Sequence, residues 1–524
     1  MRFVPAGPQV PARHGWRLAA APVAGALPAL AFPAPSLWWF AYVALVPWLL
    51  LLRTAGTARR AALEGWLGGC GLIVALHHWL LPSLHVFLLP LAALLGLLWI
   101  PWALLVRRLL GGEPSARDVG RALLVLPAGW LLAELVRSWE GLGGPWGLLG
   151  ASQWQVPAAL RLASVGGVWL VGLMVVAVNC AVAVLLSVRR ARRVALAGTA
   201  GCAVVTAVVW VGAPQPEPYG MLRVAVVQPG MVGGADGSER RFAAGERLTR
   251  QLAGSGADLV VWGESSVGED LVRRPDLARR LAALSARVGA PLLVNVDARG
   301  GGADGRAPGI YKSALLIGPD GPTGDRYDKM RLVPFGEYVP ARDLLGWATS
   351  VGRAAGEDRQ RGGGPVLMEL PGRDGVRFGP LVCFESAFPD MSRRLVRDGA
   401  ALLVVQSATS TFQGSWAPAQ HASLAALRAA ETGRPVVHAT LTGVSAVYGP
   451  QGARVGPALG TSERAAAVFR APLARGSTLY VRFGNWPVYG SLLVLAVFCA
   501  GEAVRSVRGP APEPSAPLAH TARG

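Results

Sequence analysis

The sequence predicts a protein of two parts, a polytopic α-helical membrane bundle of eight spans and a globular α/β domain. Of its 524 residues, 52% are hydrophobic, and the mean hydropathy is +0.38. Many apolar residues are gathered in blocks of roughly 20, the length of a membrane-spanning helix. Outside these blocks, short runs rich in Val and Leu alternate with helical patterns, which is typical of a layered α/β domain.

Seven apolar runs fill residues 1–213, which we expect to form a seven-span membrane domain. An eighth run, 486–503, is predicted to return the chain across the bilayer. The Pro- and Ala-rich composition of 505–524 predicts a disordered cytoplasmic tail. The seven N-terminal runs cover 17–34, 36–52, 62–81, 84–106, 119–137, 159–187 and 194–213.

The arginines set the expected orientation. They gather ahead of the first run and in every second loop after it, whereas the alternate loops hold only Arg137 and Arg161. The positive-inside rule then places the N-terminus in the cytoplasm and residue 214 onward outside it. The net charge of +19 follows from these clusters beside apolar runs, so we expect the lipid bilayer and not nucleic acid as the partner.

Two features of the membrane half differ from ordinary lipid-facing sequence. Segment 139–155 is rich in Gly and Trp and too short to span, so we expect an interfacial loop with Trp139, Trp146 and Trp154 at headgroup level. Asn179 lies within a predicted span, where an interhelical hydrogen bond is the expected role.

Residues 221–474 are predicted to form one globular domain. Its expected strands show no polar alternation, which indicates strands covered on both faces. Helical patterns at 276–288 and 420–432 lie between some of them. The predicted strands are 222–229, 257–262, 291–296, 313–318, 376–383, 401–406 and 435–440.

Cys383 ends one of these strands, just before a helix that we expect to open near Ser386. This position exposes the sulfur, and a helix N-terminus favours the nucleophilic thiolate. The other four cysteines lie in apolar segments, so Cys383 has no disulfide partner within its domain. The residue pattern alone leaves two interpretations open, a catalytic nucleophile and a small core residue.

A carboxylate and an ammonium group are further candidates for chemistry in this domain. Glu264 comes just after 257–262, and Lys329 lies in a loop with Glu337 downstream. A carboxylate can take the thiol proton, and an ammonium can stabilise an oxyanion. If their strands share one sheet, the three groups converge at one edge; surface charges are the alternative.

A Glu–Lys–Cys triad in an α/β domain, with the cysteine followed by an aromatic residue and Glu, resembles the nitrilase (carbon–nitrogen hydrolase) superfamily. The combination with the membrane spans is similar to the apolipoprotein N-acyltransferase family along nearly the whole chain. The segments that carry this resemblance are 143–153, 327–340, 383–386, 420–435, 442–447 and 478–487.

The resemblance implies an αββα sandwich for 221–474 and acyl transfer without a metal or cofactor. Glu264 is the implied general base, Cys383 the nucleophile and Lys329 the oxyanion stabiliser. Three further residues, Glu337, Phe384 and Glu385, are implied to support the site.

The implied acyl donor is a phospholipid, phosphatidylethanolamine being usual in the family. The implied acceptor is the α-amino group of the diacylglyceryl-cysteine of a lipoprotein precursor. The implied location is the bacterial cytoplasmic membrane, with the catalytic domain on its extracytoplasmic side.

The chain departs from the family pattern at two places. Gly263 stands before the base where Pro is usual, and SATSTFQG, 407–414, replaces the usual Asn-Asp-Ala-Trp-Phe-Gly loop. Two other functions fit parts of the sequence. A membrane-tethered nitrilase-type amidase explains the triad, and a non-enzymatic membrane protein explains the spans.

Overall fold

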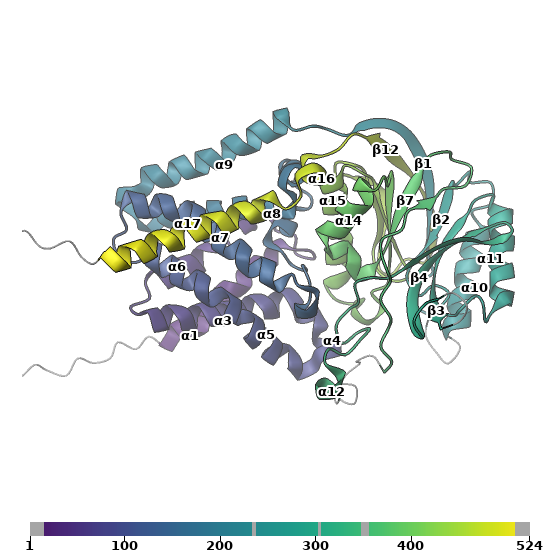
Figure 1. The fold of residues 1–524 in the computed structure, drawn as a ribbon, viewed down its shortest axis with the longest axis horizontal. Coiled ribbons are helices and arrows are strands. Elements are labelled where there is room, and N and C mark those ends of the chain that lie inside the picture. The colour runs from purple at the N-terminus through teal and green to yellow at the C-terminus, as the bar shows by residue number, and fades with distance from the viewer. Residues whose placement is uncertain (1–14, 233–236, 302–304, 347–355, 509–524) are drawn as a thin grey trace, which may run out of the picture.

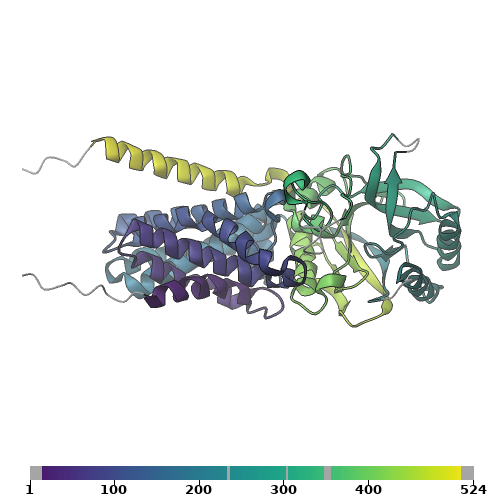
Figure 2. The same cartoon turned by 90° about the horizontal axis from the view of Figure 1, so that it is seen from below.

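The computed structural model describes residues 15–232, 237–301, 305–346 and 356–508. A helical bundle forms one end of the elongated molecule, and two β-sheets with their own helices form the other (Figures 1 and 2). The first described helix begins, and the last ends, at the end of the bundle away from the sheets (Figure 1).

Each of the eight predicted apolar runs is largely helical. The helices of the bundle are α1 (Gly15–Ala26), η1 (Leu27–Ala31), η2 (Trp38–Tyr42), α2 (Val46–Arg53), α3 (Ala58–His77), η3 (His78–Leu80), α4 (Leu81–Leu84), η4 (His85–Phe87), α5 (Leu88–Gly96), η5 (Leu97–Trp99), α6 (Ile100–Leu110), α7 (Ala116–Arg137), η6 (Glu140–Leu142), η7 (Leu149–Gln153), α8 (Pro157–Ser187), η8 (Arg189–Ala191), α9 (Arg192–Gly212) and α17 (Trp486–Arg508).

Five helices in the described part of the chain are long and apolar enough to cross a membrane. One of them, Ala58–Leu110, is 53 residues long and contains both the third and the fourth predicted runs. The first two runs form shorter helices joined by 3-10 turns, so their length alone does not qualify them as spans. The five candidates are Ala58–Leu110, Ala116–Arg137, Pro157–Ser187, Arg189–Gly212 and Trp486–Val507.

The last helix differs from its predicted boundary. α17 continues to Arg508, so residues 505–508 are helical and not part of a disordered tail. An ion pair of 2.7 Å between Arg505 and Glu502, at i and i+3, supports this extra turn. The rest of the expected tail, 509–524, lies outside the described residues.

The bundle is held by close backbone contact and by aromatic packing. A Cβ atom on Gly25 of α1 would lie 1.9 Å from the carbonyl oxygen of Gly68 on α3, so these helices touch through their small residues. Trp48, Trp102 and Trp130 pack edge to face with ring centroids 5.1–6.1 Å apart.

Asn179 makes the expected interhelical hydrogen bonds. Its side chain accepts from the backbone N–H of Leu45 and donates to the carbonyl oxygen of Ala41, both at 2.8 Å. These contacts join α8 to the segment around η2 and α2, which confirms the packing role predicted for Asn179.

The described residues of the globular part form two six-stranded sheets. The first has the order β12-β1-β2-β3-β4-β5 and the second β11-β10-β9-β8-β7-β6. The strands of the two sheets are β1 (Glu217–Gln228), β2 (Leu259–Trp262), β3 (Leu292–Gly300), β4 (Gly309–Gly318), β5 (Gly321–Asp328), β6 (Met368–Glu369), β7 (Arg377–Val382), β8 (Leu402–Ser407), β9 (Val436–Thr440), β10 (Ser445–Tyr448), β11 (Arg454–Leu459) and β12 (Ala465–Arg475).

Helices cover the outer faces of both sheets, which gives the αββα layering (Figure 1). One apolar core lies between the sheets, and a second packs the first sheet against α10 and α11. The largest core runs from α14 and α15 directly into the membrane bundle, so the second helix layer is shared between the two parts. The helices are α10 (Gly237–Arg250), α11 (Pro275–Val288), α12 (Arg342–Leu345), η9 (Cys383–Ala387), α14 (Pro389–Arg397), η10 (Ser410–Phe412), α15 (Ala417–Thr432) and α16 (Leu479–Phe483).

All seven predicted strands are present, but five others were not predicted. The missed strands are antiparallel, and several are exposed on one face; β11, for example, buries only its last residue. Such strands carry mixed polar sequence and lack the continuous apolar run of a strand covered on both faces. The missed strands are β5, β6, β10, β11 and β12.

Candidate active site

Three predicted site residues follow the ends of three strands. Glu264 follows β2, Lys329 follows β5 and Cys383 follows β7. β2 and β5 belong to the first sheet and β7 to the second, so the prediction of one shared sheet edge is wrong. The sandwich instead brings together strand ends from two facing sheets, and the backbone N–H of Glu264 donates to the carbonyl oxygen of Ser407 across them at 3.1 Å.

The Lys329 ammonium lies between two carboxylates. Its Nζ is 3.3 Å from Oε1 of Glu264 and 2.8 Å from Oε1 of Glu337, and only 1% of its side chain is exposed. Burial lowers the pKa of Lys329, but the two carboxylates raise that pKa by more, so it lies well above its usual value. Lys329 is therefore a fixed cation, and an ammonium with two acceptors has a third N–H to donate.

The Cys383 thiol belongs to the same charge cluster. Burial and, after it, the negative charge of Glu264 raise the pKa of the thiol, and the positive charge of Lys329 lowers it; together they raise the pKa to about 12. The helix α14 begins after Phe388, and Cys383 is the first residue of the short 3-10 turn η9 that precedes it. The expected stabilisation of a resting thiolate by a helix N-terminus is thus wrong: the resting sulfur is a protonated thiol that needs a base.

The backbone at Cys383 is unusual, since its φ is +51°, in the left-handed region that non-glycine residues rarely occupy. Strain of this kind persists only where surrounding contacts hold it. The carbonyl oxygen of Cys383 lies 3.0 Å from both His421 Nε2 and Ser386 Oγ. These two side chains fix the turn that presents the sulfur.

Ser407 and His421 were not predicted as site residues. Ser407 ends β8, and its hydroxyl lies 3.0 Å from His421 Nδ1 and also hydrogen-bonds to the Cys383 side chain. Burial lowers the pKa of His421 to about 4, so the imidazole is neutral at pH 7. Both residues lie within the segments 407–414 and 420–435, but no spacing rule distinguishes them there from ordinary core residues.

Glu385 connects the cysteine turn to the lysine loop. Its Oε2 accepts from the N–H of Val382 at 2.7 Å, and its Oε1 accepts from Tyr327 Oη and the N–H of Met330, both at 2.7 Å. The carboxyl is fully buried, and burial raises its pKa. Glu385 therefore sets the spacing between the loops that carry Cys383 and Lys329.

Glu337 and Phe384 occupy different sides of the cluster. The second oxygen of Glu337 accepts from the N–H of Val333 at 2.8 Å, which orients the carboxylate toward Lys329. The ring of Phe384 packs against that of Phe388, and a Cβ on Gly144 would lie 2.6 Å from it. Phe384 thus meets the loop 139–155 of the membrane half.

The loop 139–155 of the membrane half is a contact surface for the globular domain. Trp139 is exposed, but Trp146 is buried, donating to Gln420 Oε1 at 2.9 Å and packing on His421. Trp146 is therefore covered by the globular domain and, unlike Trp139, is not open to lipid. Trp79 of η3 packs on both Trp146 and Phe412. The loop 407–414, which differs from the family pattern, therefore forms part of an aromatic wall beside the site.

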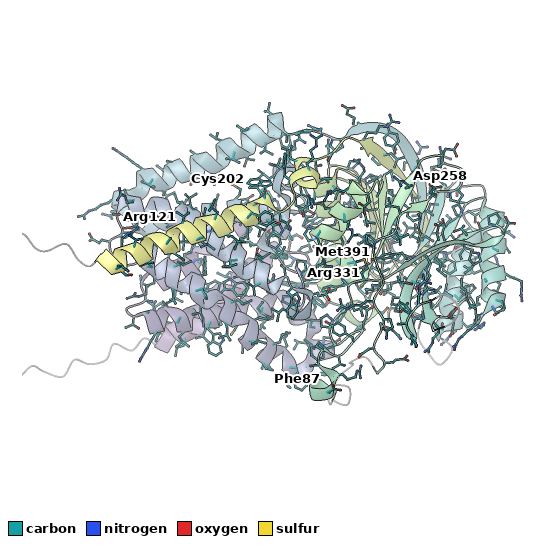
Figure 3. The ribbon with its side chains drawn as sticks, in the orientation of Figure 1. Phe87, Arg121, Cys202, Asp258, Arg331 and Met391 are labelled. Atoms are coloured by element: carbon teal, nitrogen blue, oxygen red, sulfur yellow. The ribbon has the colours of Figure 1, made fainter. Side chains whose placement is uncertain are left out.

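Charged contacts join the lysine loop to the membrane half. Arg331, labelled in Figure 3 where the two parts meet, lies 3.7 Å from Glu140 and 2.5 Å from Asp390. Arg361 also pairs with Glu140. The loop that bears Lys329 is therefore attached to η6.

The glycine before Glu264 has a geometric cause. A Cβ on Gly263 would lie 1.9 Å from the backbone N of Leu441, where the two sheets approach each other. A larger residue requires the backbone to move, so this departure from the family pattern fits the local packing.

Two family models match the chain. The apolipoprotein N-acyltransferase N-terminal domain matches residues 24–181, and the carbon–nitrogen hydrolase domain matches residues 223–475. A protein of Azotobacter vinelandii named apolipoprotein N-acyltransferase is 32% identical over 529 residues, covering 94% of this chain and 96% of the relative. One of the same name from Allorhizobium ampelinum is 33% identical over 476 residues, covering 84% and 87%. Among solved structures, a mutant of the amidase from Nesterenkonia sp. AN1 covers 51% of this chain and 98% of its own, with 20% identity and a TM-score of 0.35.

Proposed function

The chain belongs to the apolipoprotein N-acyltransferase family, and from this premise we propose how its own residues transfer an acyl chain to lipoproteins. Family membership makes it a membrane-embedded acyltransferase of lipoprotein maturation. The proposal concerns the catalytic residues, the donor lipid and the orientation. The observation that carries it is the buried ammonium of Lys329 between Glu264 and Glu337, in one charge cluster with the Cys383 thiol.

In the first half of the reaction, Glu264 takes the proton of the Cys383 thiol while the sulfur attacks an ester carbonyl of the donor phospholipid. The carbonyl oxygen becomes an oxyanion that accepts from the remaining N–H of Lys329. When the ester C–O bond breaks, the departing alkoxide receives the proton from Glu264 and leaves as lysophospholipid. The acyl chain remains on Cys383 as a thioester.

In the second half, the α-amino group of the diacylglyceryl-cysteine of a lipoprotein precursor attacks the thioester carbon. Glu264 takes a proton from the attacking nitrogen while Lys329 again faces the oxyanion. When the C–S bond breaks, Glu264 passes that proton to the sulfur, which returns to the thiol. The product is an N-acylated lipoprotein. The mechanism is ping-pong because both substrates use the same sulfur in turn.

The other site residues have supporting roles. Glu337 holds Lys329 in place, and Glu385 holds the loops of Cys383 and Lys329 at a fixed spacing. Ser407 donates to His421 Nδ1, and His421 Nε2 donates to the carbonyl oxygen of Cys383, so both residues support the turn that presents the sulfur. Phe384 and the aromatic wall of Trp79, Trp146 and Phe412 are apolar neighbours suited to an acyl chain.

We propose phosphatidylethanolamine as the main acyl donor. We also propose that the chain crosses the bacterial cytoplasmic membrane eight times. The arginine pattern supports a cytoplasmic N-terminus and an extracytoplasmic catalytic domain. The first described helix begins, and the last ends, at the same end of the bundle, which supports an even number of membrane crossings. The proposed units are 1–213, 221–474 and the eighth span at 486–503.

The proposal is tested with purified protein, a fluorescent phosphatidylethanolamine and a diacylated lipopeptide. We expect release of fluorescent lysolipid or acyl transfer to the lipopeptide amine, according to the labelled chain, and neither with Cys383→Ala. If a soluble amide is hydrolysed while no lysolipid forms, the protein is a membrane-tethered amidase and the proposal is wrong.

A further inference from the structure

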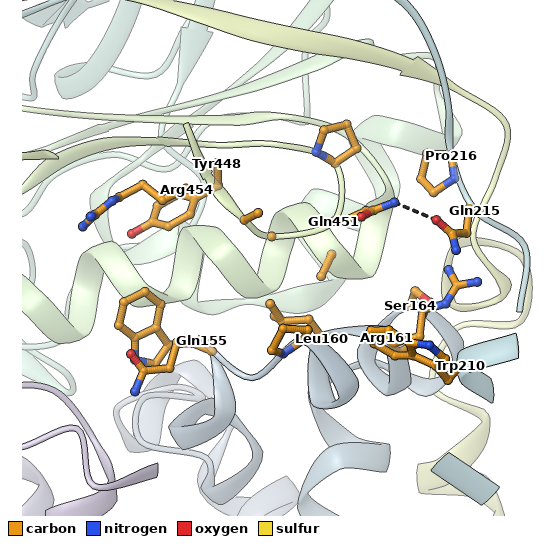
Figure 4. Close-up of a pocket in the computed structure, with 16 residues that line it drawn as sticks. Gln155, Leu160, Arg161, Ser164, Trp210, Gln215, Pro216, Tyr448, Gln451 and Arg454 are labelled. Atoms are coloured by element: carbon orange, nitrogen blue, oxygen red, sulfur yellow. Dashed lines mark hydrogen bonds between the residues drawn. The ribbon is translucent and has the colours of Figure 1, made fainter. Parts of the chain in front are cut away.

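A pocket lies where the catalytic domain meets the membrane helices, away from Cys383. Its volume is about 540 Å³, within the ~300–1,000 Å³ typical of small-molecule sites. In Figure 4, Tyr448 and Arg454 line the wall that the catalytic domain forms. Gln155 and Leu160 line the opposite wall, at the start of α8. Ala430 of α15 also lines it, nine positions after His421, or roughly 13 Å along the helix.

The pocket carries unbalanced positive charge. The described residues that line it include two arginines, Arg161 and Arg454, and neither Asp nor Glu. Gln155, Gln215 and Gln451 add amide groups, and a hydrogen bond of 2.7 Å from Gln451 to Gln215 closes one end (Figure 4). An anion with hydroxyl groups matches this lining, whereas an ammonium group has no carboxylate to meet.

Two N–H groups of the lining lack partners. Arg161 donates through its Nη atoms to the carbonyl oxygens of Ala213 and Pro214, which fixes the guanidinium at the end of α9. Its Nε and the indole Nε1 of Trp154 are hidden from solvent, and neither has a hydrogen-bond partner among the described residues. The two Nη contacts fix the positive charge of Arg161 in the wall of the pocket, next to the end of α9.

The pocket also adjoins a surface suited to lipid. Only 6% of the most apolar stretch of α9 is buried inside the protein, and Val204, Val208 and Val211 are largely exposed on it. Trp210, 51% exposed near the end of this helix, lines the pocket. Tryptophan at the end of a lipid-facing helix marks the headgroup level of a bilayer.

We propose that this pocket binds the headgroup of an anionic phospholipid of the phosphatidylglycerol type. Its negative charge is attracted by the positive charges of Arg161 and Arg454, and its acyl chains lie along α9. This lipid is not the acyl donor. It holds the catalytic domain against α8 and α9, and its binding does not depend on the proposed acyl transfer.

The test measures thermal unfolding of the purified full chain in detergent. Added phosphatidylglycerol is expected to raise the unfolding temperature by about 3 °C or more, as expected for a ligand of the folded state. Phosphatidylethanolamine with the same acyl chains, and inorganic phosphate, are expected to shift it by less than about 1 °C. An equal shift with phosphatidylethanolamine overturns the preference for an anionic lipid, and an equal shift with inorganic phosphate overturns a lipid site.

Variants locate the site. Arg454→Gln and Arg161→Gln are expected to reduce the shift caused by phosphatidylglycerol by at least half, while Arg279→Gln, on α11 at the far end of the molecule, keeps it. Arg454 is exposed on β11, so Arg454→Gln decides the question even if Arg161→Gln does not fold. A full shift in Arg454→Gln overturns the proposed site.

Discussion

Two buried ion clusters of the catalytic domain differ in their charge balance. At the sheet ends, one cation, Lys329, faces two carboxylates, Glu264 and Glu337, beside the Cys383 thiol. On α15, one cation, Arg428, faces one carboxylate, Glu431, at 2.9 Å, and both side chains are at most 1% exposed. The first cluster has excess negative charge, whereas the second is neutral overall.

This difference in charge matches a difference in role: the first cluster takes part in the reaction, and the second holds the structure together. Burial and the excess negative charge together raise the pKa of Cys383 and keep the thiol protonated until Glu264 takes its proton. The balanced pair instead joins elements: Arg428 donates to the carbonyl oxygen of Ala387, and Glu431 accepts from the N–H of Val168 at 2.8 Å. It connects the end of the cysteine turn to the kink of α8, where Gly167 has a φ of +67°.

The largest expected effect comes from removing the sulfur. Cys383→Ala is expected to reduce lysolipid release and lipopeptide acylation by about 10⁴-fold or more, because the covalent route is lost. Single-turnover assays with fluorescent phosphatidylethanolamine measure this. Cys499→Ala, on exposed α17, is the matched control and is expected to keep parental activity. Retention of activity by Cys383→Ala contradicts the assignment.

Removing the excess negative charge is expected to make the Cys383 thiol more acidic and the acyl transfer slower. Glu264→Gln loses the proposed base, so acyl transfer falls by about 10²–10⁴-fold. The same change removes a negative charge that raises the pKa of Cys383, so that pKa falls and more thiolate exists at pH 8. We therefore expect faster alkylation by iodoacetamide together with slower acyl transfer.

The pH profile of alkylation checks the sign. With a pKa of about 12, alkylation of Cys383 in the parent rises about tenfold per pH unit from pH 7 to 10 without levelling. In Glu264→Gln the profile begins to level at lower pH. An unchanged profile in this variant indicates that Glu264 does not act on the sulfur, and Glu269→Gln is the matched control.

Breaking the balanced pair is expected to affect stability more than chemistry. Arg428→Met leaves Glu431 buried without its cation, at a cost of about 3–5 kcal/mol in the free energy of unfolding. The double variant Arg428→Met/Glu431→Leu removes both charges and is expected to recover part of this loss. Thermal unfolding in detergent measures both, and equal stability of the two variants contradicts the structural role of the pair.

The smallest expected effect is at the partly exposed contact between the domains. Glu140→Gln removes the partner of Arg331 and Arg361, whose side chains are 29% and 47% exposed. Ion pairs of this kind contribute about 1 kcal/mol or less, so the unfolding temperature is expected to change little. A large loss of stability shows that this contact resembles the buried pairs more than surface ones.

The sequence was informative where chemistry is local. Glu264, Lys329 and Cys383 each follow a strand, and the structure brings all three together with Glu337 and Glu385. The pairing of strands into sheets is non-local, so the sequence could not place β5 and β7 in different sheets. Asn179 was interpreted correctly because a polar group within a span requires a partner.

The missed features depend on tertiary contacts. Ser407 and His421 become site residues only because β8 and α15 bring them to Cys383. Trp146 has the sequence context of a headgroup anchor, but the catalytic domain covers it. The alternating or short strands β10, β11 and β12 lack a continuous apolar run, so their sequence resembles that of loops.

The most direct test is mass spectrometry of the peptide that contains Cys383 after the purified protein is incubated with phosphatidylethanolamine and no acceptor. We predict an acyl adduct on Cys383 that is released by neutral hydroxylamine and by a diacylated lipopeptide. Lysolipid formation with Cys383 unmodified throughout the reaction contradicts the thioester mechanism.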